Sequence, residues 1–294
     1  MANGEVWTIQ KLLGWMTGYF TEKGIDSPRL STEMLLSYVL GLKRIELYTN
    51  FSQPVAKPQL DKLRELVKRA GENEPIAYLT GRSEFYSLEM TVTRDCLIPR
   101  PETELLVERS VELLRKRSGK QLVCDLCTGC GCIAVAIAKN FLDAQIVATD
   151  ISDEALKIAL QNAQKHKVDE RISFLLGDLF EPIIPELDKY KFDLVVCNPP
   201  YVTSGEYETL EPNVKNFEPP QALLGGRDGL DVYRKICEQV EKFLKPDAAL
   251  VLEIGYSQGN SVKELLDETA LFSEISLEKD FQNNDRIVTA SKKM

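Results

Sequence analysis

The sequence predicts an α/β protein in which a doubly wound, largely parallel sheet of seven strands follows a small helical bundle and a β-hairpin. Three observations support this prediction. Residues 5–70 carry apolar side chains at helical intervals, residues 76–98 alternate as strands do, and from Gln121 onward strand-like and helix-like segments alternate. The last two strand-like segments are joined by DFQNND without a helix, so the final strand should pair antiparallel.

The first 75 residues are expected to form a helical domain. One helix is predicted in WTIQKLLGWMTGYF, a second begins at Ser27-Pro28 and ends near Gly41, and a third covers about residues 57–70. Gly71 and the polar ENEP that follows it close the domain. Residues 1–75 carry ten basic and nine acidic side chains, whereas the remainder has a net charge of −10, and this difference also indicates two modules.

Residues 76–98 are expected to form a β-hairpin linker, because FYSLEMTVTRDCLI alternates and is rich in β-branched and aromatic residues. The second predicted domain covers residues 99–294 and opens, after Pro99-Arg100-Pro101, with a helix over Glu102–Arg117. Its predicted strands are Leu122–Leu126, Gln145–Asp150, Arg171–Asp178, Phe192–Asn198, Ala249–Ile254, Phe272–Leu277 and Arg286–Ala290. The predicted helices between them include Glu154–Lys165 and Leu230–Phe243.

Composition and charge limit the function classes. The chain of 294 residues is 44% hydrophobic and 28% charged, and its formal net charge of −9 argues against a protein that holds a nucleic-acid duplex by its phosphates. The start lacks the basic region of a signal peptide, and no apolar run approaches the ~18 residues of a membrane span. We therefore expect a cytoplasmic protein without membrane or stable nucleic-acid partners. A monomer is our expectation, although the sequence does not itself fix the oligomeric state.

Four cysteines lie within nine residues, in CDLCTGCGC from Cys124 to Cys132. Structural zinc sites usually bring two separated CxxC pairs, and the spacing here matches an iron–sulfur run at its first three positions only. A strand, a loop and a helix would also separate the sulfurs. The total of seven cysteines is odd, which does not suggest a disulfide framework. We therefore predict no metal site and interpret these cysteines as small buried residues.

The two glycines of the same stretch indicate a nucleoside-binding loop. They stand in Asp-x-x-x-Gly-x-Gly at residues 125–131, between a strand and a helix, where backbone N–H groups can face a ligand. Asp150 ends the next predicted strand, and a carboxylate there can bind both hydroxyls of a ribose. Asp178 ends the third predicted strand, where it could accept a hydrogen bond from an adenine amine. The alternative for either acid is a turn or cap residue.

NPPY, residues 198–201, follows the fourth predicted strand. Two prolines cannot continue a central strand, so the chain leaves the sheet there, and a simple proline turn is the alternative to a functional motif. Strands one and four flank the switch point of a doubly wound sheet, so the glycine loop and NPPY should meet at one crevice. The Asn198 side-chain oxygen and the Pro199 carbonyl could then accept both hydrogens of a planar –NH2 group, with Tyr201 packed against it. Its nitrogen could attack a methyl group on a sulfonium.

The chain resembles the bacterial-type release-factor glutamine methyltransferases, the HemK/PrmC family, over nearly its whole length. The resemblance rests on GIDSPRLSTEMLLSYVLG, EPIAYLTGRSEFYSL, LIPRPETELLVE, DLCTGCGCIAVAIA, ATDIS, GDLF, NPPY, LEIGYSQG and NDRIVTA. It implies a seven-stranded, Rossmann-like methyltransferase domain that uses S-adenosylmethionine as methyl donor. It also implies a role in translation termination, with the glutamine amide of the Gly-Gly-Gln motif in class 1 peptide-chain release factors as acceptor and the domain of residues 1–75 helping to bind that substrate.

The resemblance also implies the site residues. Those expected at the cofactor are Cys127, Thr128, Gly129, Cys130, Gly131, Asp150, Leu179 and Asn198, with Asp178 added from its position near a strand end. Those expected to hold the substrate glutamine are Asn198, Pro199, Pro200 and Tyr201, of which Asn198, Pro199 and Tyr201 are the catalytic residues. Family loops commonly read DLGTGSG, so Cys127 replaces a glycine and would be strained at positive φ. The roles of Glu102 and Glu104 in PRPETE are left open.

Other functions fit parts of the sequence. A DNA adenine amino-methyltransferase uses the same NPPY chemistry, but it must flip a base and contact phosphates, and RKRSGK at 115–120 is the only dense basic run. The acceptor could instead be a glutamine of another protein, such as a ribosomal protein, or a small molecule. From other classes, the alternatives are a non-enzymatic metal or redox sensor built on Cys124–Cys132 and a binding module that has lost catalysis. The intact NPPY argues against the binding module.

Overall fold

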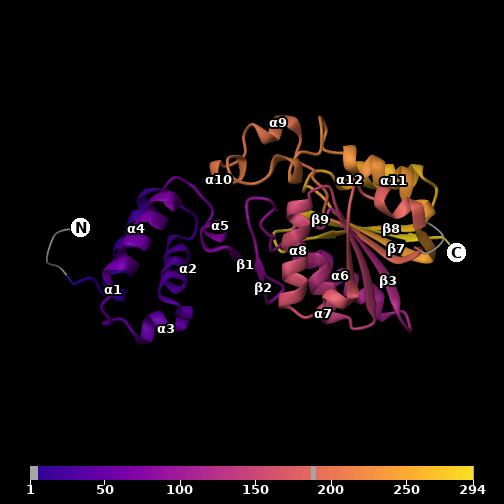
Figure 1. Ribbon diagram of the computed structural model, residues 1–294. Helices are drawn as coiled ribbons and strands as arrows, with labels where there is room; N and C mark the ends of the chain where they lie inside the picture. Colours follow the sequence, from indigo (N-terminus) through magenta and orange to yellow (C-terminus); the bar gives the residue numbers. More distant parts are fainter. Residues whose placement is uncertain (1–5, 187–189, 294) are drawn as a thin grey trace. The chain divides into compact units, whose positions relative to one another are not determined.

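The computed structural model describes residues 6–186 and 190–293, and the chain forms two compact units (Figure 1). The first unit comprises Met1–Arg82 and Glu211–Phe217, and the second comprises Ser83–Leu210 and Glu218–Met294. Each unit has its own cluster of buried apolar side chains, which is a property of compact domains.

Helices make up the first unit. They are α1 (Ile9–Glu22), α2 (Pro28–Leu40), α3 (Arg44–Thr49), α4 (Lys57–Gly71) and α5 (Ile76–Thr80), with the short α10 (Pro212–Lys215) from the distant segment. The three helices predicted from the apolar pattern are confirmed as α1, α2 and α4. Gly41 ends α2 in the left-handed conformation, at a φ of +68° that glycine adopts without strain. The six-residue α3 was not predicted, because a helix of this length shows little periodicity.

The linker differs in part from its prediction. The hairpin is confirmed as β1 (Arg82–Phe85) and β2 (Leu88–Thr91), but residues 76–80 form α5, so the prediction of a hairpin over all of 76–98 is wrong. The two-residue turn, Tyr86-Ser87, has φ values of +50° and +60°, which is the left-handed geometry that hairpins usually obtain from Asn-Gly. The Tyr86 N–H donates to a carboxylate oxygen of Glu104 at 2.7 Å, and this bond supports the turn.

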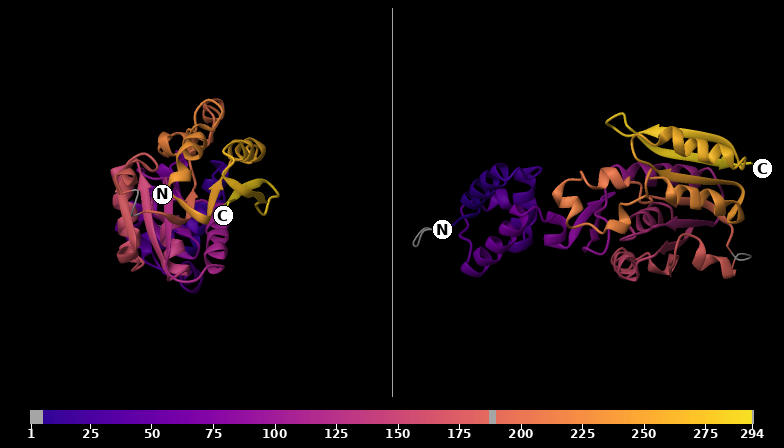
Figure 2. Two further views of the ribbon diagram at one scale, coloured as in Figure 1. Left: turned by 90° about the vertical axis from the view of Figure 1, so that its right-hand side faces the viewer. Right: turned by 90° about the horizontal axis from the view of Figure 1, so that it is seen from above.

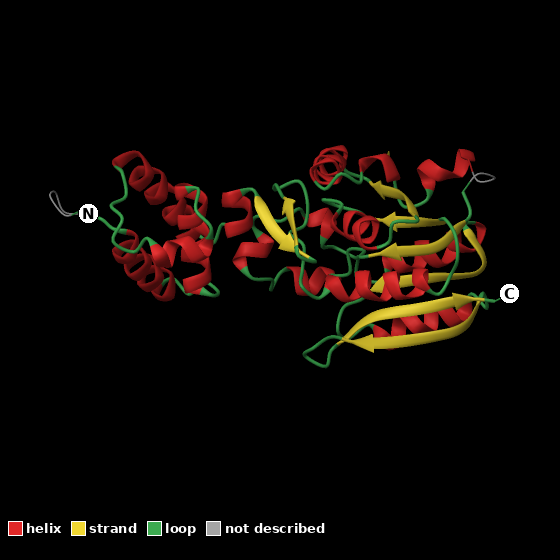
Figure 3. Cartoon of the chain, turned by 90° about the horizontal axis from the view of Figure 1, so that it is seen from below, coloured by secondary structure: helices red, strands yellow, loops and turns green. Residues whose placement is uncertain are grey.

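The second unit contains a seven-stranded sheet in the order β5-β4-β3-β6-β7-β9-β8. Its strands are β3 (Gln121–Leu126), β4 (Ala144–Asp150), β5 (Ile172–Leu176), β6 (Phe192–Cys197), β7 (Leu244–Glu253), β8 (Phe272–Lys279) and β9 (Asp285–Lys292). The strands β3 to β7 pair in parallel, and β9 runs antiparallel to both β7 and β8 (Figure 3). The predicted doubly wound sheet with an antiparallel last strand is confirmed. The prediction that Asp178 ends a strand is wrong, because β5 stops at Leu176.

Helices cover both faces of this sheet (Figures 1 and 2). One face carries α6 (Thr103–Arg115), α7 (Cys132–Asn140) and α8 (Asp153–Lys165), and the other carries α11 (Asp231–Gln239) and α12 (Gly259–Glu268). Shorter pieces are α9 (Ser204–Tyr207) and the 3-10 turns Asp169–Arg171, Glu181–Glu186, Pro220–Ala222 and Val240–Lys242. Within the described ranges, none of the helices combines the length and the apolar character that crossing a bilayer requires.

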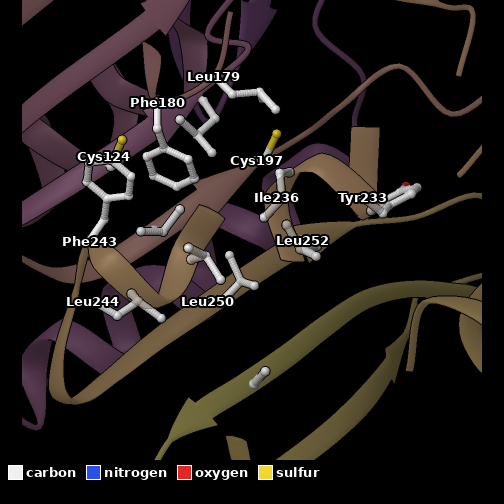
Figure 4. Packing of buried hydrophobic residues seen from close by; sticks show 14 of the residues in the cluster. Cys124, Leu179, Phe180, Cys197, Tyr233, Ile236, Phe243, Leu244, Leu250 and Leu252 are labelled. Carbon is white, nitrogen blue, oxygen red and sulfur yellow. The ribbon is translucent and has the colours of Figure 1, made fainter. Parts of the chain in front are cut away.

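The core of the second unit lies between the sheet and its helices (Figure 4). The rings of Phe180 and Phe243 stack there with centroids 4.3 Å apart and an interplanar angle of 6°. Cys124 and Cys197 belong to the same cluster as fully buried side chains. The central strands are apolar along most of their length because helices cover both of their faces. Asp125 of β3 and Glu253 of β7 are buried carboxylates in these strands and are therefore exceptions that need an explanation.

Candidate active site

The carboxyl ends of the central strands bring the predicted motifs together. Leu126, at the end of β3, is paired with Thr149 of β4 and with Cys197 of β6. The residues that follow these three along the chain are Cys127, Asp150 and Asn198. They therefore stand side by side at the switch point between β3 and β6, where open α/β sheets bind their ligands.

A cavity of about 400 Å³ opens at this edge. Its volume falls within the roughly 300–1,000 Å³ of small-molecule sites. Its wall contains the predicted residues Cys127, Gly129, Asp150, Asp178, Leu179, Asn198 and Pro200. The other predicted residues, Thr128, Cys130, Gly131, Pro199 and Tyr201, do not line it. The wall also contains residues that the sequence did not single out, among them Cys96, Ile151, Gln221 and Lys235.

The buried carboxylate of Asp125 is hydrogen-bonded to the glycine loop and to the start of α7. Asp125, which is 0% exposed, accepts hydrogen bonds from the Thr128 hydroxyl at 2.6 Å and from the Ala134 N–H at 3.2 Å. Its second oxygen has no hydrogen-bond partner among the described residues. Burial raises the pKa of Asp125 to about 7. Asp125 and Thr128 therefore shape the loop and the start of α7 from the side away from the cavity.

Gly131 and Cys130 serve the packing of α7 against α8. Gly131 has a φ of +78°, and a Cβ at this position would lie 2.9 Å from the Ala159 Cβ and 3.1 Å from its Cα. Such contacts leave no room for a side chain, so glycine is required here for close approach of the two helices. Cys130 is 2% exposed, and its carbonyl accepts a hydrogen bond from the Asn162 side chain at 2.9 Å.

Asp150 presents a fixed carboxylate to the cavity. One oxygen accepts from the Gly129 N–H at 2.8 Å, and the other accepts from the Ser152 N–H at 2.9 Å. Burial raises the pKa of Asp150, and both backbone N–H groups oppose that shift by stabilising the charged form. Each oxygen retains accepting capacity, so the carboxylate can bind two neighbouring hydroxyls, as a ribose offers them.

Cys127 adopts the backbone conformation that its position in the loop usually reserves for glycine, with a φ of +56°. A non-glycine residue in this region carries strain of the order of 1 kcal/mol or more. The Cys127 side chain packs against the core cluster and lines the cavity. The sequence predicted strain at Cys127 if this residue had a positive φ, and the structure shows that it has one.

Cys127→Gly should be more stable than Cys127→Ala by about 1 kcal/mol, which reverses the usual order of these two residues. Both variants lose the sulfur, so their difference isolates the strain that the Cβ causes at positive φ. Urea denaturation followed by circular dichroism measures the free energy of unfolding of each. An alanine variant as stable as the glycine variant would show that the loop relaxes and stores no strain.

Asp178 and Leu179 follow β5 in the cavity wall. The Asp178 carboxylate forms an ion pair with the Lys235 ammonium at 2.7 Å, and both side chains are substantially exposed. Sequence spacing gave no sign of this partner, which reaches Asp178 from α11. Leu179 has a φ of +50°, which turns the chain sharply after β5. Its side chain belongs to the core cluster.

The NPPY residues are held at the end of β6. Asn198 and Pro200 are half-buried in the cavity wall, whereas Pro199 is buried. Tyr201 packs against the core cluster, and burial raises the pKa of its phenol. Its carbonyl accepts a hydrogen bond from the Gln258 side chain at 3.0 Å, which fixes the path of the chain as it leaves the sheet.

Two buried residues that the sequence did not assign stand behind Asn198. The Asn198 Nδ2 donates to the Thr103 Oγ1 at 3.2 Å, and the Thr103 hydroxyl donates to the Glu253 carboxylate at 2.6 Å. Thr103 is 2% exposed and Glu253 is 1% exposed. The only signals for them were their places in PRPETE and LEIGYSQG, two segments whose proximity the sequence pattern does not reveal.

A third buried carboxylate, Glu218, lies just before a segment that lines the cavity. Glu218 accepts hydrogen bonds from the Arg100 guanidinium at 2.6 Å and from the Ile98 N–H at 3.2 Å, and its side chain is 2% exposed. The residues directly after it include Pro219 and Gln221, which line the cavity. Arg100 of PRPETE thus connects the start of the second predicted domain to the cavity wall.

The cysteines are distributed over several environments. All seven are free thiols, and Cys124 and Cys197 lie in the core of the sheet. Cys130 and Cys132 are buried beside the glycine loop, and Cys127 lies in the cavity wall. Among residues 6–186 and 190–293, no group of three or more His, Cys, Asp and Glu side chains is arranged to hold a metal ion.

Comparison with known proteins gives matches along the whole chain. Residues 11–81 match the PrmC N-terminal domain, and residues 117–289 match a methyltransferase domain. A release factor glutamine methyltransferase of Geobacter sulfurreducens is 42% identical over 284 residues, which cover 97% of this chain and 96% of that protein. A release factor glutamine methyltransferase of Rhodopirellula baltica is 38% identical over 294 residues, with 99% and 98% covered.

A solved structure shows the same fold at lower identity. A methyltransferase from Pyrococcus furiosus is 14% identical to this chain and superposes on it with a TM-score of 0.51. The superposition covers 81% of this chain and 100% of that protein's chain. This likeness concerns the fold alone.

Proposed function

Since this chain belongs to the release factor glutamine methyltransferase family, we propose that it transfers a methyl group from S-adenosylmethionine to the side-chain amide nitrogen of a glutamine in a class 1 peptide-chain release factor. The acceptor in this proposal is the glutamine of the Gly-Gly-Gln motif. The observation that carries the proposal is similarity to named relatives over nearly the full length of the chain, with both modules included.

The residues present fit S-adenosylmethionine, the methyl donor of this family. The Asp150 carboxylate can bind the ribose hydroxyls, and the Gly129 segment of the loop brings backbone close to the ligand without a side chain. We place the methionine end beside Cys127 and Asn198, and the adenine near Ile151, Asp178 and Leu179. When bound, the cofactor supplies a methyl group on a positively charged sulfur.

NPPY would bind the acceptor amide. The Asn198 Oδ1 and the Pro199 carbonyl would accept one N–H each from the glutamine –NH2 group, with Pro200 and Tyr201 forming the adjacent surface. These bonds fix the nitrogen and increase the electron density that it can donate. The nitrogen held by Asn198 and Pro199 would form its bond to the methyl carbon as the C–S bond broke, with the electron pair left on sulfur and one proton passing from the nitrogen to water.

The domain division is part of the proposal. We assign the helical unit, which comprises the predicted domain of residues 1–75 and α5, to recognition of the release factor, the hairpin that follows within the predicted linker of residues 76–98 to a connection, and residues 99–294 to catalysis. The match of residues 11–81 to the PrmC N-terminal domain supports a distinct module at the start of the chain. A protein substrate explains why a methyltransferase would need a separate helical unit. In this proposal the protein acts as a monomer in the cytoplasm and does not bind nucleic acid stably.

One transfer assay tests the proposed function. The protein is mixed with methyl-labelled S-adenosylmethionine and, separately, with an unmodified class 1 release factor and an unmethylated DNA duplex. Peptide mass spectrometry should place the label on the Gly-Gly-Gln glutamine. Label on DNA would instead assign the chain to the adenine amino-methyltransferases, and cofactor binding without transfer to either substrate would indicate a different acceptor.

A further inference from the structure

The Asn198 amide is held through a chain of three side chains that starts in the protein interior. Asn198 follows β6, Thr103 is the first residue of α6, and Glu253 is the last residue of β7. Cys197 is paired with Leu252 across β6 and β7, so the next residues of the two strands are neighbours at the carboxyl edge. Nδ2 of Asn198 lies 3.2 Å from Thr103 Oγ1, which lies 2.6 Å from the Glu253 carboxylate.

The direction of these hydrogen bonds follows from donor counting. A threonine hydroxyl has one proton, and an ionised carboxylate can only accept. The proton of Thr103 therefore goes to Glu253, and the oxygen of Thr103 is left to accept from Asn198. The Thr103 oxygen therefore attracts the –NH2 group of the Asn198 amide and repels the amide oxygen. As a result, Asn198 Oδ1 is directed away from Thr103. With Thr103 and Glu253 buried, water cannot substitute for either partner.

We propose that Thr103 and Glu253 are positioning residues that hold the Asn198 amide in the orientation that offers its oxygen to the methyl-accepting nitrogen. The inference rests on the proposed function. If the amide turned over, it would present its own –NH2 to the substrate –NH2, and two donors would face each other. The acceptor nitrogen would lose one of the two hydrogen bonds that fix it, while the cofactor side of the cavity would stay as it is.

The surroundings of Glu253 make this orientation sensitive to pH. The groups that face it are Arg286 from β9, Arg100 and Glu102 from the segment before α6, and Tyr201 after β6, and the Tyr233 hydroxyl of α11 donates to the Glu253 backbone carbonyl. Burial raises the pKa of Glu253 to about 7, against the opposing effects of the Thr103 hydroxyl and Arg286. Above that pH the carboxylate accepts from Thr103. Below it the protonated carboxyl can donate to Thr103, which frees the hydroxyl proton to attract Asn198 Oδ1, so kcat should fall as the pH drops through about 7.

The test compares Thr103→Val with Thr103→Ser. Valine keeps the shape and removes the hydroxyl, and serine restores the hydroxyl. We expect kcat for release-factor methylation to fall about 10- to 100-fold in the valine variant, the size of effect found for partners that orient metal-binding side chains, and to return to within about threefold in the serine variant. The KM for the release factor and the Kd for S-adenosylhomocysteine should change by less than about threefold in both. A valine variant with wild-type kcat, or equal losses in both variants, would overturn the proposal.

The pH profile supplies a separate test of Glu253. In Glu253→Gln the fall of kcat below pH 7 should disappear, because the amide cannot take up a proton there. Asp125, whose pKa is also raised to about 7, is unchanged in this variant. Any smaller acid limb that remains would belong to Asp125, whereas a limb with the midpoint and depth of the wild type would show that Glu253 does not control the orientation.

A substrate-free measurement keeps this inference distinct from the proposed function. In protein labelled with ¹⁵N-asparagine, the side-chain signals of Asn198 are identified by their absence from Asn198→Ala. They should shift in Thr103→Val and return in Thr103→Ser. If the wild-type protein methylates no release factor, the proposed function fails, and these signals still report the hydrogen bond. Unchanged signals in the valine variant would mean that the hydrogen-bonded chain does not exist in solution.

Discussion

Asn198→Ala should lower kcat for methyl transfer to the release factor by about 10²–10³-fold, the size of effect seen when one fixed hydrogen-bond partner is removed from a reacting group. Asn198 lies in the cavity wall next to the glycine loop, and in the proposed mechanism its Oδ1 is the directed acceptor for the substrate amide. Alanine removes that acceptor and leaves Asp150 and Gly129 unchanged. The Kd for S-adenosylhomocysteine, measured by titration calorimetry, should therefore remain within a few-fold of the wild-type value.

Asn140→Ala is a matched control. Asn140 is an exposed asparagine whose side chain, like that of Asn198, donates one hydrogen bond; its acceptor is the Ala136 carbonyl at 2.8 Å, at the far end of α7 from the glycine loop. This variant should keep wild-type kcat if the effect at position 198 is due to the site and not to loss of a hydrogen-bonded asparagine amide in general. Equal activity of the Asn198 and Asn140 variants would contradict the assignment of NPPY as the acceptor site.

Those parts of the site that depend on the course of the backbone could be predicted from the sequence. Strand order brings the ends of β3 and β6 together, so the spacing of the glycine loop and NPPY along the chain was enough to expect them at one cavity. The positive φ at Cys127 could be anticipated for another reason, because related loops carry a glycine at this position. Predictions of this kind depend on backbone topology, which the apolar pattern reveals.

Side-chain partners from distant segments could not be predicted. Thr103 and Glu253 are 150 positions apart and meet only because α6 covers β6 and β7. Lys235 reaches Asp178 from another helix, and its long side chain leaves no periodic trace in the sequence. The turn at Tyr86-Ser87 lacks the usual glycine or asparagine, so its left-handed geometry was also hidden. Such features arise from tertiary contacts that override local preferences.

The roles of the two acids at the cavity should separate in cofactor affinity. Asp150→Ala should raise the Kd for S-adenosylhomocysteine by at least about 10²-fold, because the proposed binding mode loses two hydrogen bonds from ribose hydroxyls to a charged group, each contributing roughly 1.5–3 kcal/mol. The Gly129 N–H also loses its acceptor, so the loop itself is less well fixed. Asp178→Ala should change the Kd by less than about tenfold, because its carboxylate is exposed and already paired with Lys235, and exposed ion pairs contribute little.

Asp150→Asn provides an intermediate test of the same idea. It keeps one accepting oxygen at nearly the same position, so its Kd should fall between those of the wild type and the alanine variant. Titration calorimetry with S-adenosylhomocysteine measures all of these variants, and thermal unfolding without ligand checks that each is folded. Equal losses in Asp150→Ala and Asp178→Ala would mean that the acids share the ribose, whereas a larger loss at Asp178 would reverse their assignment. The predicted order follows from one structural difference: Asp150 is fixed by two backbone N–H groups, whereas Asp178 is paired with an exposed lysine side chain.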